Sequence, residues 1–468
     1  MNDSHKKNSP HCPVKLDDAA QVSQQETLQK VVAAHQQALA LLQQTEMAYG
    51  RLIPRQLLTL LERDSIIDVK LGDQVERKLT VMFSDIRNFT PLSESMTPGE
   101  NFEFINSYLS QMEPVISQHR GIIDKYMGDT IMALFTQGAD DAVTGSIAML
   151  EKLIHYNAGR VRAGYVPIQI GIGLNTGLVM IGTVGGLNRM DSTVIGDAVN
   201  LTSRIEEATK TYHAPLLISQ NTLYDLADAA KYDIRLLDRI RVKGKAQPLS
   251  LYEIFDNDPA DLKHGKRVSK RQFEEAIAYY HLQEIPRAIE LLTHCIAIAP
   301  TDTPAQIYLA RCEDYLATGQ HLSTGELDAD LEWHDEFHIG IKEIDLSHKL
   351  LFDKINAFTA TVKKGDYNAF HDIFNFLADH AQHGFEVEAA LMHRYNYSFC
   401  ASHMQEHQRF IENFMALWNE AESHTCDPRY LSFRTQLLLF DWFTGHVAKI
   451  DRHMGRYLVQ AMQASHSA

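Results

Sequence analysis

The sequence predicts a multidomain protein in which an α+β domain follows an N-terminal helical segment and an antiparallel four-helix bundle ends the chain. Three observations carry this prediction. Short β-rich runs alternate with helical patterns in residues 77–255. Four long helical patterns with short connections fill the last part of the chain. Of the 23 histidines, 14 lie between His321 and Ala468, which indicates chemistry at the C-terminal end.

Composition narrows the class of protein further. The chain has 468 residues, of which 45% are hydrophobic and 22% are charged, so it is long enough for several domains with buried cores. A formal net charge of -16 without a basic run argues against nucleic-acid binding. We expect no membrane span and no secretory signal. Five cysteines without paired spacing fit free thiols in a reducing cytosol, so the expected location is cytoplasmic.

The N-terminal part is expected to begin with a disordered tail, residues 1–18, followed by a helical segment, residues 19–76. Residues 19–49 contain neither glycine nor proline and are rich in Gln, Ala and Leu. Apolar side chains recur at roughly helical spacing, at Leu28, Val31, Val32, Leu39 and Leu42. Two interpretations stay open: a helix that packs on its own domain, or a dimerising helix that delivers a signal to the following domain.

Residues 77–255 are predicted to form the α+β domain. The expected strands cover residues 79–83, 122–126, 131–135, 168–174, 178–181, 193–195, 216–219 and 249–255. The expected helices cover residues 101–119, 142–158 and 197–210.

Residues 256–330 are predicted to form a helical linker. Residues 256–270 are charged and contain proline and glycine, so we expect an extended connection there. Residues 273–316 contain two helical stretches that resemble a tetratricopeptide helix pair, with Pro300 ending one helix. About one and a half repeats are too few for a solenoid, so the region is interpreted as a spacer or, alternatively, as a partner-binding module. A second linker is expected at residues 323–330.

The last domain, residues 331–468, is predicted to be the four-helix bundle. Its expected helices cover residues 344–362, 367–395, 402–421 and 429–463.

Two aspartates mark a first candidate site. Asp85 ends an apolar strand, and Asp129 lies in a tight turn, with Gly128, between two strand-like runs. If the strands are neighbours, both carboxylates meet at one edge of the sheet. Carboxylates and a backbone carbonyl are ligands that suit Mg2+, which bridges substrate phosphates. For either aspartate alone, ordinary turn chemistry is the simpler interpretation.

Polar residues downstream fit a nucleotide site. Asn200 and Arg204 lie at positions i and i+4, on one face of a predicted helix. Lys243 lies in a glycine-containing turn before a strand. An asparagine that orients a ribose and cations that neutralise phosphates are what a nucleotide-cyclising site needs.

Four motifs in order make a resemblance specific. FSDIRNFT, DKYMGD, TVIGDAVNLTSR and VKGK are similar to the motifs of the class III nucleotidyl cyclase catalytic domain, over residues 77–255. The resemblance implies a ferredoxin-like core that closes ATP or GTP to the 3',5'-cyclic monophosphate with release of pyrophosphate. It also implies a head-to-tail homodimer, in which each site combines residues of both chains.

The resemblance further implies roles for individual residues. Asp85, Asp129 and the Ile86 carbonyl would hold two Mg2+ or Mn2+ ions in each active site. Asn200 would position the ribose, Arg204 would stabilise the transition state, and Lys243 would hold the terminal phosphates.

Base selection is expected to depend on Lys125 and Thr193. Lys125 lies where the family carries its purine-selecting lysine, and Thr193 lies at the partner selector position. A lysine donates to the N1 acceptor of adenine, and a threonine hydroxyl accepts from its 6-amino group. Guanine presents the opposite pattern at these atoms, so ATP is the expected substrate.

A second candidate site combines histidines and carboxylates of the bundle. His403 and His407 lie at i and i+4 on the third predicted helix. The other predicted helices contribute His348, Glu388, and His446 with Asp451. Inward-facing imidazoles and carboxylates from four helices are the arrangement by which bundles hold two metals, and such ligands suit Fe, Mn or Zn.

This part of the chain resembles bacterial hemerythrin-like domains, whose bundle carries a non-haem diiron centre that binds O2. Trp333 with GIKEID, the HxxxH pair and the His446–Asp451 pair carry the resemblance. A straight helix does not align His446 with Asp451, so a local π-bulge is expected. The histidine that the family carries four residues before Glu388 is Gly384 in this chain. His380 or His383, or water, is the expected replacement.

Together the two resemblances predict an adenylate cyclase regulated by O2 or by another small diatomic or redox signal. Two alternatives stay open. One is a guanylate cyclase with the same sensor. The other is a non-catalytic O2- or iron-binding protein whose cyclase-like domain only dimerises.

Overall fold

The computed structural model describes residues 15–50, 55–186, 189–241, 248–319, 333, 337–366, 370–423 and 426–467. The chain divides into two compact units, residues 1–69 and residues 70–468. The first unit contains the helices α1 (Lys15–Gly50), α2 (Arg55–Leu60) and η1 (Ile66–Asp68). Helix α1 begins four residues before the expected helical segment, and residues 1–14 lie outside the described part. All five apolar positions of its predicted stripe are exposed, from 46% at Leu39 to 65% at Leu42.

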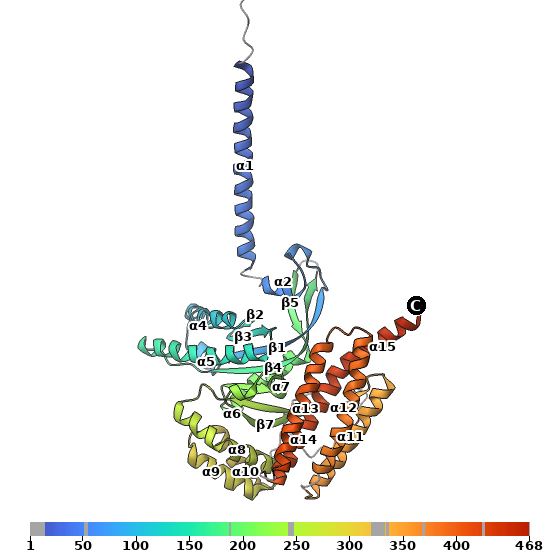
Figure 1. Ribbon diagram of the computed structural model, residues 1–468. Helices are drawn as coiled ribbons and strands as arrows, with labels where there is room; N and C mark the ends of the chain where they lie inside the picture. Colours follow the sequence, from blue (N-terminus) through green and yellow to red (C-terminus); the bar gives the residue numbers. More distant parts are fainter. Residues whose placement is uncertain are drawn as a thin grey trace, which may run out of the picture. The chain divides into compact units, whose positions relative to one another are not determined.

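The second unit is built on one mixed sheet with the strand order β2-β3-β1-β4-β6-β8-β7, and β5 pairs with β4 (Figure 1). All pairings are antiparallel except that of β4 with β6. The strands are β1 (Gln74–Ile86), β2 (Gly121–Met127), β3 (Thr130–Phe135), β4 (Ile170–Gly186), β5 (Arg189–Ile195), β6 (Leu216–Ser219), β7 (Ile234–Arg241) and β8 (Pro248–Ile254).

Helices cover both faces of the sheet. On one face α4 (Pro98–Gln118) and α5 (Ala139–Arg162) share a core with β1, β3 and β4, including Ile172 and Leu174. Helix α6 (Asp197–Tyr212) approaches the opposite face, because a Cβ atom on the intervening Gly173 would lie 2.4 Å from the Glu206 backbone nitrogen. Short helices α3 (Phe89–Glu94), α7 (Gln220–Asp225) and η2 (Ala229–Lys231) complete this part.

The region after the sheet is not an extended linker. Helix α8 (Ala260–His281) covers most of residues 256–270, and α9 (Ile285–Ile298) and α10 (Thr303–Thr318) follow it. The charges that indicated a linker are paired instead: Lys266 is buried, with its Nζ 2.7 Å from Glu253 and 2.6 Å from Asp258. These helices share one hydrophobic core with α6, β7 and the C-terminal helices, so the region is part of the compact unit.

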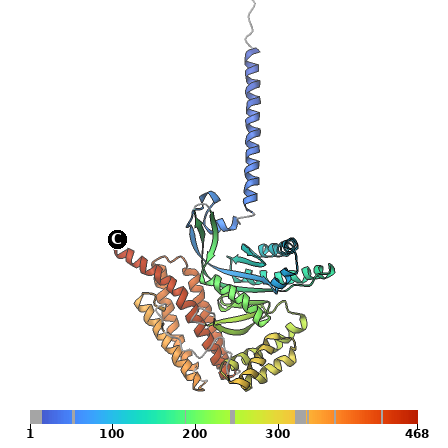
Figure 2. The same ribbon diagram turned by 180° about the vertical axis from the view of Figure 1, so that it is seen from behind.

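The C-terminal helical region comprises α11 (Lys342–Lys363), α12 (Phe370–Arg394), α13 (Cys400–Glu422), α14 (Pro428–Trp442), the π-helix η4 (Phe443–Asp451) and α15 (Arg452–Ser467). Helix α11 packs against α12 and α14, and α13 packs against α12 and α14. This region lies beside the sheet domain in both views (Figures 1 and 2), with α13 against α7 and α14 against β8. None of the described helices combines the length and the apolar character that a membrane crossing requires.

Two strand predictions differ from the structure. The runs predicted at residues 168–174 and 178–181 belong to one long strand, β4, because β1 pairs with it continuously from Gln74 to Ile86. Strand β7 was not predicted, because its arginines suggest a solvated surface. In the structure, Arg235 and Arg239 are each only 1% exposed. Arg235 binds Asp302 through two contacts of 2.7 Å, and Arg239 lies over the Phe440 ring.

Candidate functional sites

The first candidate site lies where β1 ends and the β2–β3 turn begins. Strands β1 and β3 are antiparallel neighbours, with Ser84 opposite Ile131, so Asp85 and Asp129 meet at one edge of the sheet. The Thr130 hydroxyl donates to Asp85 Oδ1 at 2.8 Å, and the Ile86 N–H donates to Asp129 Oδ2 at 3.3 Å. Gly128 takes φ +67°, a left-handed conformation that glycine adopts without strain and that closes the turn.

The two carboxylates compete for one proton. Burial and the Asp85 carboxylate raise the pKa of Asp129 to about 6. Burial also opposes ionisation of Asp85, but hydrogen bonds from Lys210, Thr130 and Asp129 outweigh it and lower the pKa of Asp85. The Lys210 ammonium lies 2.9 Å from Asp85 Oδ2. The paired carboxylates attract the Lys210 ammonium. Their oxygens are also the donors that Mg2+ and Mn2+ prefer.

Lys210, Glu206 and Arg87 at this edge were not predicted. Burial raises the pKa of Glu206 to about 7, and Arg87 Nη1 lies 3.6 Å from Glu206 Oε1. The sequence spacing could have identified two of them, because Glu206 and Lys210 are four residues apart and therefore lie on one face of α6.

The other predicted site residues lie elsewhere in this chain. On α6, Asn200 is exposed, and Arg204 is half-buried. At 1.5 Å per residue they lie about 15 Å and 9 Å along the axis from Lys210, which contacts Asp85. Within the described residues, no hydrogen bond or ion pair joins either of them to the carboxylate pair.

The two residues predicted to select the base are on edge strands. Lys125 of β2 lies 3.4 Å from the carboxylate of Asp124, whose side chain is fully buried. Thr193 of β5 is half-buried and pairs with Gly182 of β4. Lys243 lies outside the described residues.

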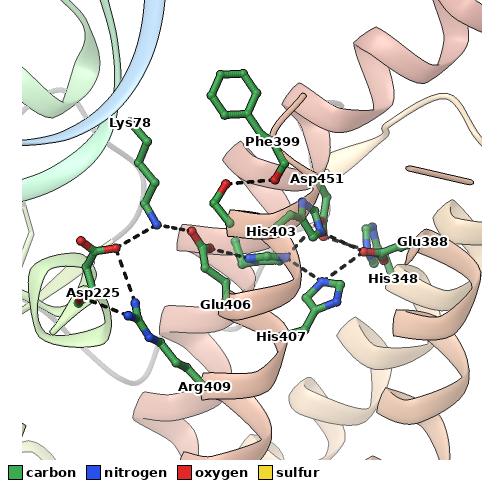
Figure 3. A network of polar contacts seen from close by, with 12 residues as sticks. Lys78, Asp225, His348, Glu388, Phe399, His403, Glu406, His407, Arg409 and Asp451 are labelled. Atoms are coloured by element: carbon green, nitrogen blue, oxygen red, sulfur yellow. Dashed lines mark hydrogen bonds and ion pairs between the residues drawn. The ribbon is translucent and has the colours of Figure 1, made fainter. Parts of the chain in front are cut away.

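The second candidate site is a buried cluster inside the C-terminal helical region (Figure 3). Six side chains converge there, from α11, α12, α13 and η4, and none is more than 5% exposed. They are His348, Glu388, His403, His407, His446 and Asp451. One ligand atom from each of the five residues other than His348 lies within 4.8 Å of the others.

The geometry directs four imidazole Nε2 atoms toward two carboxylates. His348 Nε2 lies 3.2 Å from Asp451 Oδ2 and 3.6 Å from Glu388 Oε1. His403 Nε2 lies 3.2 Å from both carboxylates. His407 Nε2 and His446 Nε2 are 3.1 Å apart, so they cannot both carry a proton without repulsion. A cation held by these nitrogens and oxygens would relieve that repulsion, and this mixed donor set suits Fe, Mn or Zn.

The π-helix η4 explains how one helix supplies two of these groups. Residues five positions apart come into register when the backbone bonds run from i to i+5, whereas an α-helix would turn them apart. The structure places this geometry over Phe443–Asp451, so His446 and Asp451 both face the cluster. The sequence spacing had predicted such a bulge.

The carboxylates of the cluster stabilise positive charge inside it. Burial alone would lower the pKa of His446, but Asp451 and Glu406 outweigh it and raise the pKa to about 10. The same competition, with Asp451 and Glu388, raises the pKa of His348 to about 9. The carboxylates thus retain positive charge on the imidazoles, and a metal ion supplies that charge in exchange for protons.

The structure distinguishes the proposed replacements for the missing histidine. His383 is exposed on α12 and is not among the converging groups, so the structure does not support it as a ligand. The His380 side chain lies outside the described part. A Cβ atom at Gly384 would lie 3.3 Å from Ser347 Oγ.

A chain of polar contacts, which sequence reasoning missed, leads from this cluster to the sheet domain (Figure 3). His446 Nδ1 lies 2.8 Å from Glu406 Oε2, and the other oxygen of Glu406 accepts from Lys78 Nζ of β1 at 2.6 Å. Lys78 also lies 3.1 Å from Asp225 of α7, which in turn contacts Arg409 at 3.5 Å. A cavity of about 580 Å3 adjoins these residues.

Comparison with known proteins concerns the sheet domain. Residues 72–255 match the sequence model of the adenylate and guanylate cyclase catalytic domain. An adenylate cyclase of Anabaena cylindrica is 38% identical over 234 residues, which are 49% of this chain and 47% of the relative. The terminal-differentiation-specific adenylate cyclase of Dictyostelium discoideum is 34% identical over 299 residues, which are 60% of this chain and 13% of the relative. The chain therefore spans less than half the length of these curated relatives.

Among solved structures, the adenylyl cyclase CyaB from P. aeruginosa is 35% identical, with 39% of this chain and 96% of that chain covered and a TM-score of 0.36. Residues 72–255 thus carry an adenylate and guanylate cyclase catalytic domain, followed by a helical C-terminal region.

Proposed function

We propose that the chain is an adenylate cyclase that converts ATP to 3',5'-cyclic AMP and pyrophosphate. The observation that carries the proposal is the Asp85–Asp129 pair, which meets at a sheet edge inside the matched catalytic domain. Two relatives that match this domain are named adenylate cyclases. The cyclisation forms a bond between the ribose 3'-oxygen and the α-phosphorus and breaks the bond to the departing pyrophosphate.

The carboxylate pair fits two Mg2+ or Mn2+ ions, held by Asp85, Asp129 and the Ile86 carbonyl. When bound, the ions lower the pKa of the ribose 3'-hydroxyl and neutralise phosphate charge. Lys210 would leave Asp85 as the metal enters, because both compete for the same oxygen. Asn200 would orient the ribose and Arg204 would stabilise charge on the reacting phosphate. Lys243 would hold the terminal phosphates.

The active site would be shared between two copies of the chain. Asn200 and Arg204 lie about 15 Å and 9 Å along α6 from the residue that contacts Asp85. A head-to-tail homodimer would bring the ribose and phosphate binders of one copy to the carboxylates of the other. The exposed apolar stripe of α1 supports the predicted role of this helix in dimerisation.

Lys125 and Thr193 favour adenine over guanine, since together they match the N1 acceptor and the 6-amino donor of adenine. A guanylate cyclase is the alternative from the same family. Comparing turnover of ATP and GTP by the same preparation tests the assignment: preferred conversion of ATP supports it, and preferred conversion of GTP contradicts it.

We further propose that the C-terminal helical region is a four-helix bundle of the hemerythrin-like kind that holds a non-haem diiron centre. The six buried side chains of the cluster would hold the two ions. O2 or a redox change at this centre would regulate the cyclase. Turnover that depends on Mg2+ or Mn2+ would exclude the alternative of an iron-binding protein without catalytic activity.

A further inference from the structure

The contact between Lys78 and Glu406 joins the buried cluster, through a single carboxylate, to β1, the strand that carries Asp85. Glu406 of α13 has one oxygen 2.6 Å from Lys78 and the other 2.8 Å from His446 Nδ1. Lys78 belongs to β1, and His446 belongs to the buried cluster. Both partners of the ion pair are largely covered, with side chains 22% and 20% exposed, so solvent screens the contact only in part.

Glu406 controls the orientation of His446. The carboxylate accepts the Nδ1 proton, which leaves Nε2 free to face the cluster, where Asp451 Oδ1 lies 3.1 Å away. A carboxylate behind a metal-binding imidazole fixes the tautomer and tunes the metal. Because the same carboxylate holds Lys78, any change in its hydrogen bond to His446 changes its attraction for the lysine.

Strand β1 connects Lys78 to the catalytic edge. Asp85 is seven residues further along the strand, about 23 Å at 3.3 Å per residue. The strand is paired with β4 over its whole length and with β3 near Asp85, so a displacement at Lys78 moves a stiff element. The adjoining cavity of about 580 Å3 is lined by Lys78, Asp225 and Glu406, and it gives these side chains room to rearrange.

We propose that the Glu406–Lys78 pair is the coupling element through which the state of the cluster in the C-terminal helical region regulates the cyclase site. The inference rests on the proposed function. If His446 held a metal ion, a stronger hydrogen bond from its Nδ1 to Glu406 would weaken the attraction of Glu406 for Lys78, which would then shift toward Asp225. Lys78 is a positioning residue, because it acts on the catalytic edge through β1.

Coupling between two sites is reciprocal, so binding measurements detect it without turnover. Iron-loaded full-length protein is titrated with 3'-deoxy-ATP, which lacks the attacking hydroxyl and cannot be cyclised, and Mg2+ in the oxidised and reduced states of the protein. We expect the two dissociation constants to differ about fivefold or more. In Lys78→Met the ratio should fall to about one, whereas Lys78→Arg should retain most of it. The optical spectrum of the iron centre should respond to the analogue in the wild type but not in Lys78→Met.

Glu76→Gln is the matched control. Glu76 lies on the same strand and contacts His453 of α15, but this contact does not involve a residue of the cluster. The Glu76→Gln variant should therefore keep the wild-type ratio. A Lys78→Met protein that keeps the wild-type ratio would overturn the proposal, as would an equal loss in Glu76→Gln.

Iron content and cyclic AMP formation are measured on the same preparations. If the wild type binds iron and cyclises ATP but shows a ratio of one, the coupling fails while the proposed function stands. If it does neither, the proposed function fails and this inference fails with it.

Discussion

The two candidate metal sites of this chain differ in how fully a single copy of the chain encloses them. The Asp85–Asp129 pair lies at an open sheet edge, with both carboxylates about half-buried and Lys210 in contact with one of them. The cluster in the C-terminal helical region is closed, with six histidine and carboxylate side chains that are at most 5% exposed. Under the proposed function, the open pair would be completed by substrate and a second copy of the chain, whereas the closed cluster would keep a metal away from water.

The pKa shifts at the two sites also differ. At the open edge, burial and the Asp85 charge raise the pKa of Asp129 to about 6, so a proton competes with the metal at and below that pH and hardly at neutrality. In the closed cluster, carboxylates raise the pKa of His446 to about 10, so loading a metal displaces protons that are firmly held. Since the cluster is sealed from solvent and the sheet edge is not, we expect slow ion exchange at the second site and fast exchange at the first.

The largest expected effect breaks the open site. Asp85→Ala removes a ligand for both ions and should lower turnover by a factor on the order of 10² or more, since a lost charge-stabilising contact typically costs that much. Steady-state assays with ATP and Mg2+ measure it. Glu94→Ala, which removes an exposed carboxylate of nearby α3, is the control and should turn over normally. Unchanged turnover in Asp85→Ala would refute the metal role.

The next effect breaks the closed site. His403→Ala deletes a buried ligand, and bound iron should fall about tenfold or more, since even supporting groups around metals change affinity by that much. Metal analysis of purified protein measures it. His383→Ala, an exposed histidine of α12, should keep its iron. Equal iron in wild type and His403→Ala would contradict the ligand assignment.

A complementation experiment tests whether the catalytic site needs residues of two chains, whereas the C-terminal cluster needs only one. Asp85→Ala and Arg204→Ala should each be inactive alone. Co-expression should restore about a quarter of the wild-type turnover, because half of the dimers formed at random are mixed and each mixed dimer has one intact site. A mixture that stays inactive would argue against a site shared between chains. Iron content should not change in any of these proteins.

The smallest expected effect is a pH dependence of the open site. Protonation of Asp129, with a pKa of about 6, removes a metal ligand, so the proton competes with Mg2+ as the pH falls through that value. The Mg2+ concentration for half-maximal turnover should rise by up to about tenfold per pH unit below pH 6. It should be nearly constant between pH 7 and pH 8. A Mg2+ requirement that does not change down to pH 5 would contradict the protonation of Asp129 near pH 6.

Sequence reasoning identified the residues that the structure brings together in both candidate sites, because these residues have characteristic spacings. The strand-end position of Asp85 and the i, i+4 pair His403–His407 depend only on local periodicity, and the π-helix followed from the spacing of His446 and Asp451. Strand β7 was missed because pairing of Arg235 with Asp302, 67 residues away, decides its burial. Burial of charge by distant partners leaves no local pattern.

The contact between Lys78 and Glu406 could not be predicted from the sequence either. Lys78 and Glu406 are 328 residues apart, and each alone has the pattern of a surface charge. The prediction of an extended linker at residues 256–270 was wrong for the same reason. The charge of Lys266 is paired with Glu253 and Asp258, and these pairs form only in the folded chain. Spacing therefore predicts a site within one element or motif, and tertiary packing decides which sites communicate.

The most direct test of the account compares cyclic AMP formation, with Mg2+ present throughout, by iron-loaded protein under reducing anaerobic conditions, by the same protein in air, and by iron-free protein. The optical spectrum is recorded in parallel. The account predicts that the turnover of the iron-loaded protein changes as the spectrum changes and that the iron-free protein turns over equally with and without air. Identical turnover in all three preparations would contradict it.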